Sequence, residues 1–321
     1  MRERVLAVLA GAAALAAVAV PTASAATVTV STSAQLASAL AAAAPGTTIQ
    51  LAADTTFTGN FKAANSGTAT SRITLTGQRS AVVKATGGRT IELTGSYWTL
   101  SGFTITGGQK GLMALGVHNT LVDGVKVTGI GHEGIHFQYT STDNVVQNSE
   151  VTDTGREYAG YGEGIYFGSA VSNWPGGTPD RSDRNKAIGN KIGPDVRAES
   201  IDIKEGTTGG EIRGNTFDGT GQTGEHYADS WIDAKGNGYL ITGNKGSKVY
   251  VHDATYGAFE IHVQLDGWGR DNTFSNNIAD VQSPYAYGFY VAKTGQGTKI
   301  CGNNTVTNAK GFANVAPASG C

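Results

Sequence analysis

The chain has 321 residues, of which 46 are glycine, and 24 basic side chains against 26 acidic ones give a formal net charge of −2. A charge so close to zero excludes a general nucleic-acid-binding protein, which would need a strongly basic surface. The many glycines predict frequent tight corners rather than long helices.

The first 25 residues have the pattern of a secretory signal peptide. Arg2 and Arg4 precede a short apolar run, and Ala23-Ser24-Ala25 supplies the small residues of a cleavage site. The run is too short for a membrane anchor. We therefore expect residues 1–25 to be removed, and residues 26–321 to form a single secreted domain without membrane association. In a secreted protein the two cysteines, Cys301 and Cys321, are expected to form a disulfide.

The predicted elements begin with a short strand over residues 27–30 and an amphipathic helix over residues 33–44. Leu36 and Leu40 would lie on the buried face of this helix, and Ser31 or Ser33 would be its N-cap. A helix at this position would cap the open apolar end of the fold that follows.

From Arg72 onward a repeat of short apolar runs separated by Gly and Asn extends to the C-terminus. Its theme is apolar-x-x-Asn-x-apolar, recurring roughly every 25 to 30 residues, which is typical of a solenoid. Asn tolerates left-handed backbone geometry at corners, and stacked Asn side chains can hydrogen-bond inside the coil. Clear copies are residues 187–192, 211–217, 240–244, 273–278 and 299–304.

A second family of strands lies between these repeats, and its alternation places apolar residues inside the coil and polar residues outside. Stacked in one parallel sheet, these strands would form two outward columns. The first contains His136, Tyr166, Asp202, Asp233, Glu260 and Tyr290, and the second contains Gln138, Gly168, Lys204, Lys235 and His262.

Like charges on neighbouring strands repel each other, so the paired Asp and Lys residues of these columns need an explanation. One interpretation is a salt-bridge ladder on an exposed face. The other is an active site, bounded by the extra segments at residues 170–185 and 219–228. Trp174, Tyr161 and Trp268 would then form sugar platforms or pack inside the coil, and Glu260 and Arg270 would contact substrate.

Glu133, Glu163 and Glu199 precede three of these strands at matched positions, where we expect them at the corners rather than inside the coil. Glu163, Glu199, Asp202 and Asp233 together would offer only oxygen ligands, which suit Ca²⁺. The sequence has no calcium-binding loop of the D-x-D-x-D-G type.

Two reactions on a sugar polymer fit this set of side chains. In β-elimination on a uronate, Lys204 would remove the C5 proton, with its pKa lowered by burial and by Lys235. Lys235 or His262 would neutralise the carboxylate, and Tyr166 or His262 would protonate the leaving oxygen. In hydrolysis, Asp202 would act with Asp233 or Glu260, and the two-strand spacing of Asp202 and Glu260 comes nearer to the gap of an inverting pair.

The whole mature chain resembles the pectate-lyase-like superfamily of right-handed parallel β-helices. Residues 163–237 further resemble the alginate lyase and chondroitinase B type of polysaccharide lyase, through GEGIYFG, the E-x-x-x-x-K of Glu199 and Lys204, and RGNTF. The resemblance implies that Glu199 binds Ca²⁺ and that Lys204 is the catalytic base. Arg197 stands where that family has a second calcium-binding Glu, and Lys235 stands at or beside its catalytic Arg.

We therefore expect an all-β, right-handed parallel β-helix with a short N-terminal capping helix. The function expected is a secreted, monomeric lyase that cleaves an acidic polysaccharide, with Lys204, Lys235, Tyr166 and His262 as catalytic residues. A β-helix glycoside hydrolase and a non-catalytic glycan-binding β-helix are the alternatives.

Overall fold

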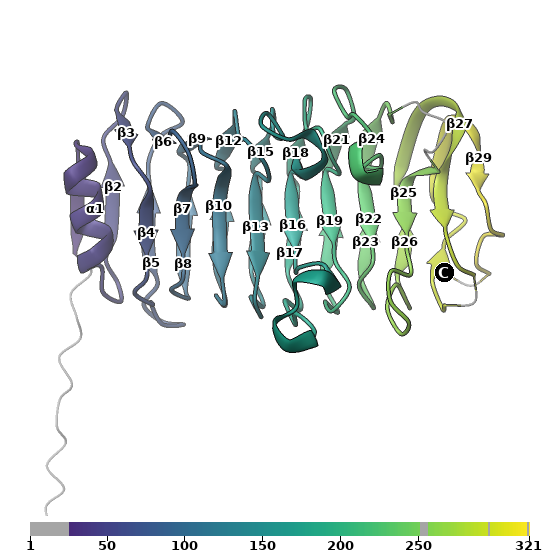
Figure 1. Cartoon of the computed structure of the whole chain (residues 1–321), viewed down its shortest axis with the longest axis horizontal. Coiled ribbons are helices and arrows are strands. Elements are labelled where there is room, and N and C mark those ends of the chain that lie inside the picture. The colour runs from purple at the N-terminus through teal and green to yellow at the C-terminus, as the bar shows by residue number, and fades with distance from the viewer. Residues whose placement is uncertain (1–25, 251–255, 295, 320) are drawn as a thin grey trace, which may run out of the picture.

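A computed structural model describes residues 26–250, 256–294, 296–319 and 321 of the chain. The expected signal peptide, residues 1–25, lies outside the described residues. The described residues form a right-handed parallel β-helix, in which successive coils stack along one axis (Figure 1). The predicted fold class is confirmed.

Each coil contributes strands to three parallel ladders. The first ladder is an 11-stranded sheet. Its strands are β1 (Thr27–Val30), β2 (Thr48–Leu51), β5 (Ile73–Thr76), β8 (Trp98–Ser101), β11 (Leu121–Asp123), β14 (Val145–Gln147), β17 (Lys186–Ile188), β20 (Glu211–Arg213), β23 (Leu240–Thr242), β26 (Thr273–Ser275) and β28 (Lys299–Ile300).

The second ladder follows the first around each coil. Its strands are β3 (Thr56–Thr58), β6 (Val82–Ala85), β9 (Thr104–Gly107), β12 (Lys126–Thr128), β15 (Glu150–Val151), β18 (Lys191–Ile192), β21 (Thr216–Asp218), β24 (Lys245–Ser247) and the first part of β27 (Ile278–Val291).

The third ladder carries the polar columns. It comprises β4 (Phe61–Ala63), β7 (Arg89–Leu93), β10 (Lys110–Leu115), β13 (Ile135–Gln138), β16 (Ile165–Phe167), β19 (Ile201–Ile203), β22 (Ile232–Ala234), β25 (Gly257–Ile261) and the last part of β27, which β29 (Thr305–Ala313) then covers.

The two ends of the stack are closed differently. Helix α1 (Ser33–Ala42) lies at the N-terminal end of the stack (Figure 1). It buries Leu36 and Leu40 in the core, as predicted. Its N-cap is Thr32, whose hydroxyl accepts a hydrogen bond from the Gln35 N–H, so the prediction of Ser31 or Ser33 is wrong by one residue. At the other end the expected disulfide joins Cys301 to Cys321.

A row of stacked, buried asparagines, the Asn ladder, runs through the corners between the first and second strand ladders. The side chain of each member hydrogen-bonds the next, which confirms the stacking predicted from the repeat. The left-handed backbone lies one residue earlier, at Gly189 or Gly243 for example, so the Asn residues are selected for their side chains rather than for backbone geometry. The ladder contains Asn190, Asn215, Asn244, Asn277 and Asn304.

Replacing Asn244 by alanine should lower the free energy of unfolding by about 3 kcal/mol or more, because it leaves several buried groups without partners. The Asn244 side chain accepts from the backbone and side chain of Asn215 and donates to Ile212 and Asn277. Chemical denaturation measures the change. Asn303→Ala, in an exposed amide pair, is the control and should cost less than about 1 kcal/mol.

Candidate active site

The strand register brings the predicted column together. Successive partners on the third ladder are His136 and Tyr166, Tyr166 and Asp202, Asp202 and Asp233, Asp233 and Glu260, and Glu260 and Tyr290. The intervening apolar residues, such as Ile201 and Ile203, are completely buried inside the coil. The predicted alternation along these strands is therefore confirmed.

The face formed by this column is not exposed, contrary to expectation. Asp202, Asp233 and Glu260 are almost fully buried although they point away from the coil interior. They line a cavity of about 610 Å³ together with residues 170–173 of one segment and His226, Ala228 and Asp229 of another. The two extra segments of the sequence are thus walls that remove the column from solvent.

Inside the cavity Lys204 and Lys235 form ion pairs with carboxylates. The Lys204 amine lies 2.6 Å from Asp202 Oδ2. The Lys235 amine lies 3.0 Å from Asp202 Oδ1 and 2.5 Å from Asp233 Oδ2. Asp202 therefore bridges both lysines, and the charges alternate in sign across the strands.

This arrangement reverses the expected pKa shift of the lysines. Burial lowers the pKa of Lys204, but the carboxylates of Asp202, Glu199 and Glu163 outweigh burial and raise it above the ordinary value. Lys235 is affected in the same way, because Asp202 and Asp233 outweigh both burial and Lys204. The expectation that the stacked lysines depress each other's pKa is wrong, since a carboxylate lies between them.

His262 extends the network toward the C-terminal coils. Its Nδ1 lies 2.9 Å from Asp233 Oδ1 and its Nε2 lies 3.6 Å from Glu260 Oε2. The Asp233 carboxylate, with a smaller contribution from Glu260, raises the pKa of His262 to about 9. Burial and the neighbouring Asp229 raise the pKa of Glu260 well above its usual range.

Tyr166 lies on the other side of the lysines. Its ring is 4.1 Å from the His136 ring, and the Lys204 amine is 5.1 Å from the centre of the Tyr166 ring. Burial, with the negative charges of Asp202 and Glu163, raises the pKa of its hydroxyl well above the usual value. The hydroxyl therefore stays protonated at neutral pH, as a proton donor requires.

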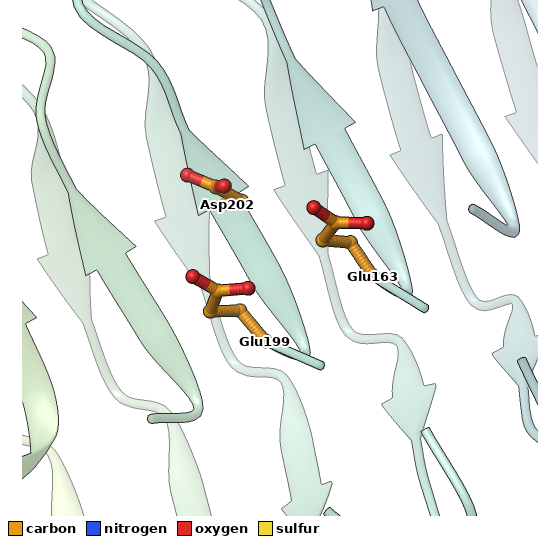
Figure 2. A group of neighbouring side chains, drawn as sticks. All are labelled: Glu163, Glu199 and Asp202. Atoms are coloured by element: carbon orange, nitrogen blue, oxygen red, sulfur yellow. The ribbon is translucent and has the colours of Figure 1, made fainter. Parts of the chain in front are cut away.

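Three carboxylates form the acidic triad Glu163, Glu199 and Asp202 (Figure 2). Glu163 and Glu199 lie at the corners before β16 and β19, as predicted, and one oxygen of each residue lies within 4.8 Å of the others. Burial and mutual repulsion raise the pKa of Glu199 to about 8 and that of Glu163 well above its usual range. Oxygen donors at this spacing fit a hard cation such as Ca²⁺, and Glu163 Oε2 is buried without a hydrogen-bond partner.

Two other residues do not join the triad. Asp233, expected as a fourth ligand, lies outside the group of three, and its oxygens contact Lys235 and His262. Arg197 turns away, and its guanidinium binds Asp153 and the Thr154 carbonyl oxygen. The positive charge of Arg197 therefore does not point toward a cation bound at the triad.

The predicted substrate-binding residues fall into two groups. Tyr161 and Glu260 line the cavity. Trp174 does not line it, because its indole N–H donates to the Ser169 carbonyl oxygen and its ring packs against Gly206. Arg270 is exposed outside the cavity, and its backbone N–H binds Asn237. The structure therefore gives Trp174 a role in holding its loop, and it removes Arg270 from the site.

Two acidic residues of the cavity wall were missed. Glu205 is completely buried, and its Oε1 accepts a hydrogen bond from the Val171 N–H at the start of the inserted loop. Burial and Asp233 raise the pKa of Asp229 to about 7. Both residues lie outside the alternating strand positions, so periodicity gave no signal for them.

The raised pKa values predict that the free energy of unfolding falls as pH rises. The stabilisation from protonated Glu199 is complete below its unfolded pKa of 4.5 and is lost as the pH rises through its folded pKa of about 8. The stabilisation from protonated His262 is complete below pH 6.5 and is lost as the pH rises through about 9. Melting temperatures measured from pH 5 to 9 should therefore decline. Glu199→Gln should flatten the decline below pH 8, and Glu211→Gln, which removes a partly exposed ion-pair carboxylate far from the cavity lining, should leave it unchanged. A melting temperature that rises over this range would contradict the account.

Comparison with known proteins identifies relatives of this chain. Residues 51–175 match the family model described as a right-handed β-helix region. The chain is 39% identical to the alginate lyase from Paenibacillus sp. str. FPU-7, with a TM-score of 0.80 over 90% of this chain and 99% of that one. No curated protein sequence matches the chain.

Two more distant structures share the fold alone. Pectate lyase Pel9A is 15% identical with a TM-score of 0.61, over 88% of this chain and 75% of that one. The surface adhesin PfbA of Streptococcus pneumoniae is 13% identical with a TM-score of 0.54, over 88% of this chain and 76% of that one.

Proposed function

This chain belongs to the same family of right-handed parallel β-helix proteins as the alginate lyase from Paenibacillus sp. str. FPU-7, and we propose on that basis that it is a secreted polysaccharide lyase acting on a uronate-containing polymer such as alginate. The observation that carries the proposal is the contact of Lys204 with Tyr166 inside a walled cavity that also holds Lys235 and His262. Base, acid and cations are the groups that β-elimination needs.

In the proposed reaction, Lys204 in its neutral form takes the C5 proton of the uronate. The electrons of the C5–H bond form the C4–C5 double bond, and the C4–O bond to the neighbouring sugar breaks. The leaving oxygen takes the proton of the Tyr166 hydroxyl. Lys235 and protonated His262 bind the substrate carboxylate, which acidifies the C5 proton and stabilises the negative charge that develops.

The acidity of the cavity does not prevent an anionic polymer from binding. Burial and mutual repulsion raise the pKa of Glu199 to about 8, so Glu199 is mostly protonated at neutral pH, and they raise the pKa values of Glu163 and Glu260 well above the usual range. At rest Lys204, Lys235 and His262 carry positive charge, and Lys204 must release its proton before it can act as the base. The protonated carboxyls can donate hydrogen bonds to a substrate carboxylate rather than repel it.

The acidic triad is also the place where Ca²⁺ would be held, by Glu163, Glu199 and Asp202. A cation there would offset the negative charges that raise the pKa of Lys204, and it would thereby favour the neutral amine that a base requires. Protons on Glu163 and Glu199 offset part of the same charge.

Millimolar Ca²⁺ should raise the melting temperature at pH 8, where more of Glu199 is ionised than at neutral pH, and a chelator should reverse the rise. Glu163→Gln should abolish the calcium effect, because it removes one charged ligand. Glu150→Gln, a carboxylate of a surface ion pair, is the matched control and should respond as the unchanged protein does. An identical melting temperature with calcium and with chelator would remove the metal from the account.

Hydrolysis is the second candidate, favoured by one observation. Glu260 has a raised pKa and lies two strands from Asp202. Two strand spacings are about 10 Å, which approaches the distance between the two carboxyl groups of an inverting glycosidase. Its Oε1, however, accepts hydrogen bonds from the N–H groups of Tyr256 and Gly257. Asp202 is also occupied by both lysines, so neither carboxylate is free to activate water.

The proposed function is tested by incubating the protein with alginate, polygalacturonate, glucuronan and dermatan sulfate and following the ultraviolet absorbance of unsaturated products. We expect absorbance to increase with at least one of them. New reducing ends without absorbance would indicate the hydrolase. Binding without turnover would indicate a glycan-binding β-helix, and no response to any polymer would overturn the proposal.

None of the helices among the described residues has the length and apolar character to span a bilayer. The Cys301–Cys321 disulfide supports the proposed secretion.

A further inference from the structure

Four aromatic rings gather before the strands of the third ladder, and two of them, Tyr161 and His226, line the cavity. His132 precedes β13, Tyr158 and Tyr161 flank and end the short turn before β16, and His226 lies in the turn before β22. Tyr161 is the centre of the group, 5.4 Å from the His132 ring, 4.8 Å from the Tyr158 ring and 5.5 Å from the His226 ring. We name these four residues the rim cluster.

The rim cluster is held in place by contacts between separate coils. A hydrogen bond of 2.5 Å joins the Tyr158 hydroxyl to His226 Nε2, across 68 positions of the chain. His226 packs so closely on Gly160 that a Cβ there would lie 3.1 Å from the imidazole Cγ. His226 also has a left-handed backbone, with φ of 57°, which costs energy for a non-glycine residue and persists only where the surroundings enforce it.

The rings are not packed into a core. Tyr161 is 46% exposed and Tyr158 is 38% exposed, although neighbouring aromatic rings inside the coil are completely buried. Tyr161 and His226 line the same cavity as Tyr166 and Lys204. An ordered, partly exposed aromatic surface continuous with a catalytic cavity is a feature of ligand sites rather than of folding.

We propose that the rim cluster is a carbohydrate-stacking subsite, which binds a pyranose ring of the polymer beside the sugar that reacts. The C–H face of a pyranose packs on an aromatic ring, and the polar edges of Tyr158 and His226 can hydrogen-bond its hydroxyl groups. The subsite rests on the proposed function, because it needs a polymer that extends from the cavity. It binds substrate without touching the reacting atoms, so it acts on KM rather than on kcat.

The test compares Tyr161→Ala, Tyr161→Phe and Tyr285→Ala with the unchanged protein, on the uronate polymer that it cleaves. Tyr161→Ala should raise KM by about 3- to 10-fold with kcat little changed, because one stacking contact is lost. Tyr161→Phe should restore KM, since the ring face remains. Tyr285 is an exposed tyrosine on β27 outside the cavity lining, so Tyr285→Ala is the control and should leave both constants unchanged.

The outcomes separate the subsite from the function on which it rests. A KM of Tyr161→Ala equal to that of the unchanged protein would overturn the subsite and leave the lyase intact. A fall in kcat that Tyr161→Phe does not restore would also overturn it, since that pattern indicates a structural or catalytic role. Absence of turnover by the unchanged protein on every uronate polymer would overturn the proposed function and the subsite together.

Discussion

Lys204→Ala should lower kcat for elimination by about 1,000-fold or more, because removing a general base typically costs between about 100-fold and 10,000-fold. Lys204 is the amine in contact with both Asp202 and the Tyr166 ring, and no other described lysine has this position. The rate of increase in product absorbance, measured at saturating polymer, gives the effect directly.

Lys204→Arg separates the role of base from the role of cation. Arginine keeps a positive charge beside Asp202 but cannot lose its proton in a protein, so it should be as inactive as alanine. Lys299→Ala removes an exposed lysine of β28 and should leave kcat unchanged. Activity retained by Lys204→Arg would show that this side chain only neutralises charge, and the base would then have to be another group.

Tyr166→Phe should lower kcat by about 100-fold or more with little change in KM, because it removes only the hydroxyl that protonates the leaving oxygen. The phenyl ring keeps the contacts with His136 and Lys204, so the site should retain its shape. Equal melting temperatures for the variant and the unchanged protein would verify this.

Two comparisons make the tyrosine result interpretable. Tyr285→Phe, on an exposed ring outside the cavity lining, should have no effect. A polymer with a better leaving group needs less help from an acid, so the loss in Tyr166→Phe should shrink with such a substrate. If Tyr166→Phe lost as much kcat with that substrate as with the ordinary polymer, Tyr166 would position the substrate rather than transfer a proton.

The strand register could be predicted from the sequence because it depends on a period of two. Ile201 and Ile203 must face the coil interior, so Asp202 and its neighbours must face outward. Since the coils stack in parallel, the order His136, Tyr166, Asp202, Asp233, Glu260 and Tyr290 follows from the order of the repeats. The Asn ladder followed from the same repeat.

The environment of these side chains could not be predicted in the same way. Burial of Asp202 depends on how two segments fold over the column, residues 170–173 and the segment that carries His226, Ala228 and Asp229, and neither segment has a period. The sign of the Lys204 pKa shift depends on whether a lysine or a carboxylate is nearer, which is a matter of side-chain conformation. Trp174 could equally have faced the cavity or the loop, since both positions suit an indole ring.

Mass spectrometry of the products formed from alginate in isotope-labelled water distinguishes elimination from hydrolysis most directly. Elimination breaks the glycosidic bond without adding water, so we expect oligomers that contain a C4–C5 double bond and have gained no labelled oxygen from bond cleavage. Hydrolysis by Asp202 and Glu260 would add one water at each cleavage. Cleavage products that carry the label and lack the double bond would contradict the account.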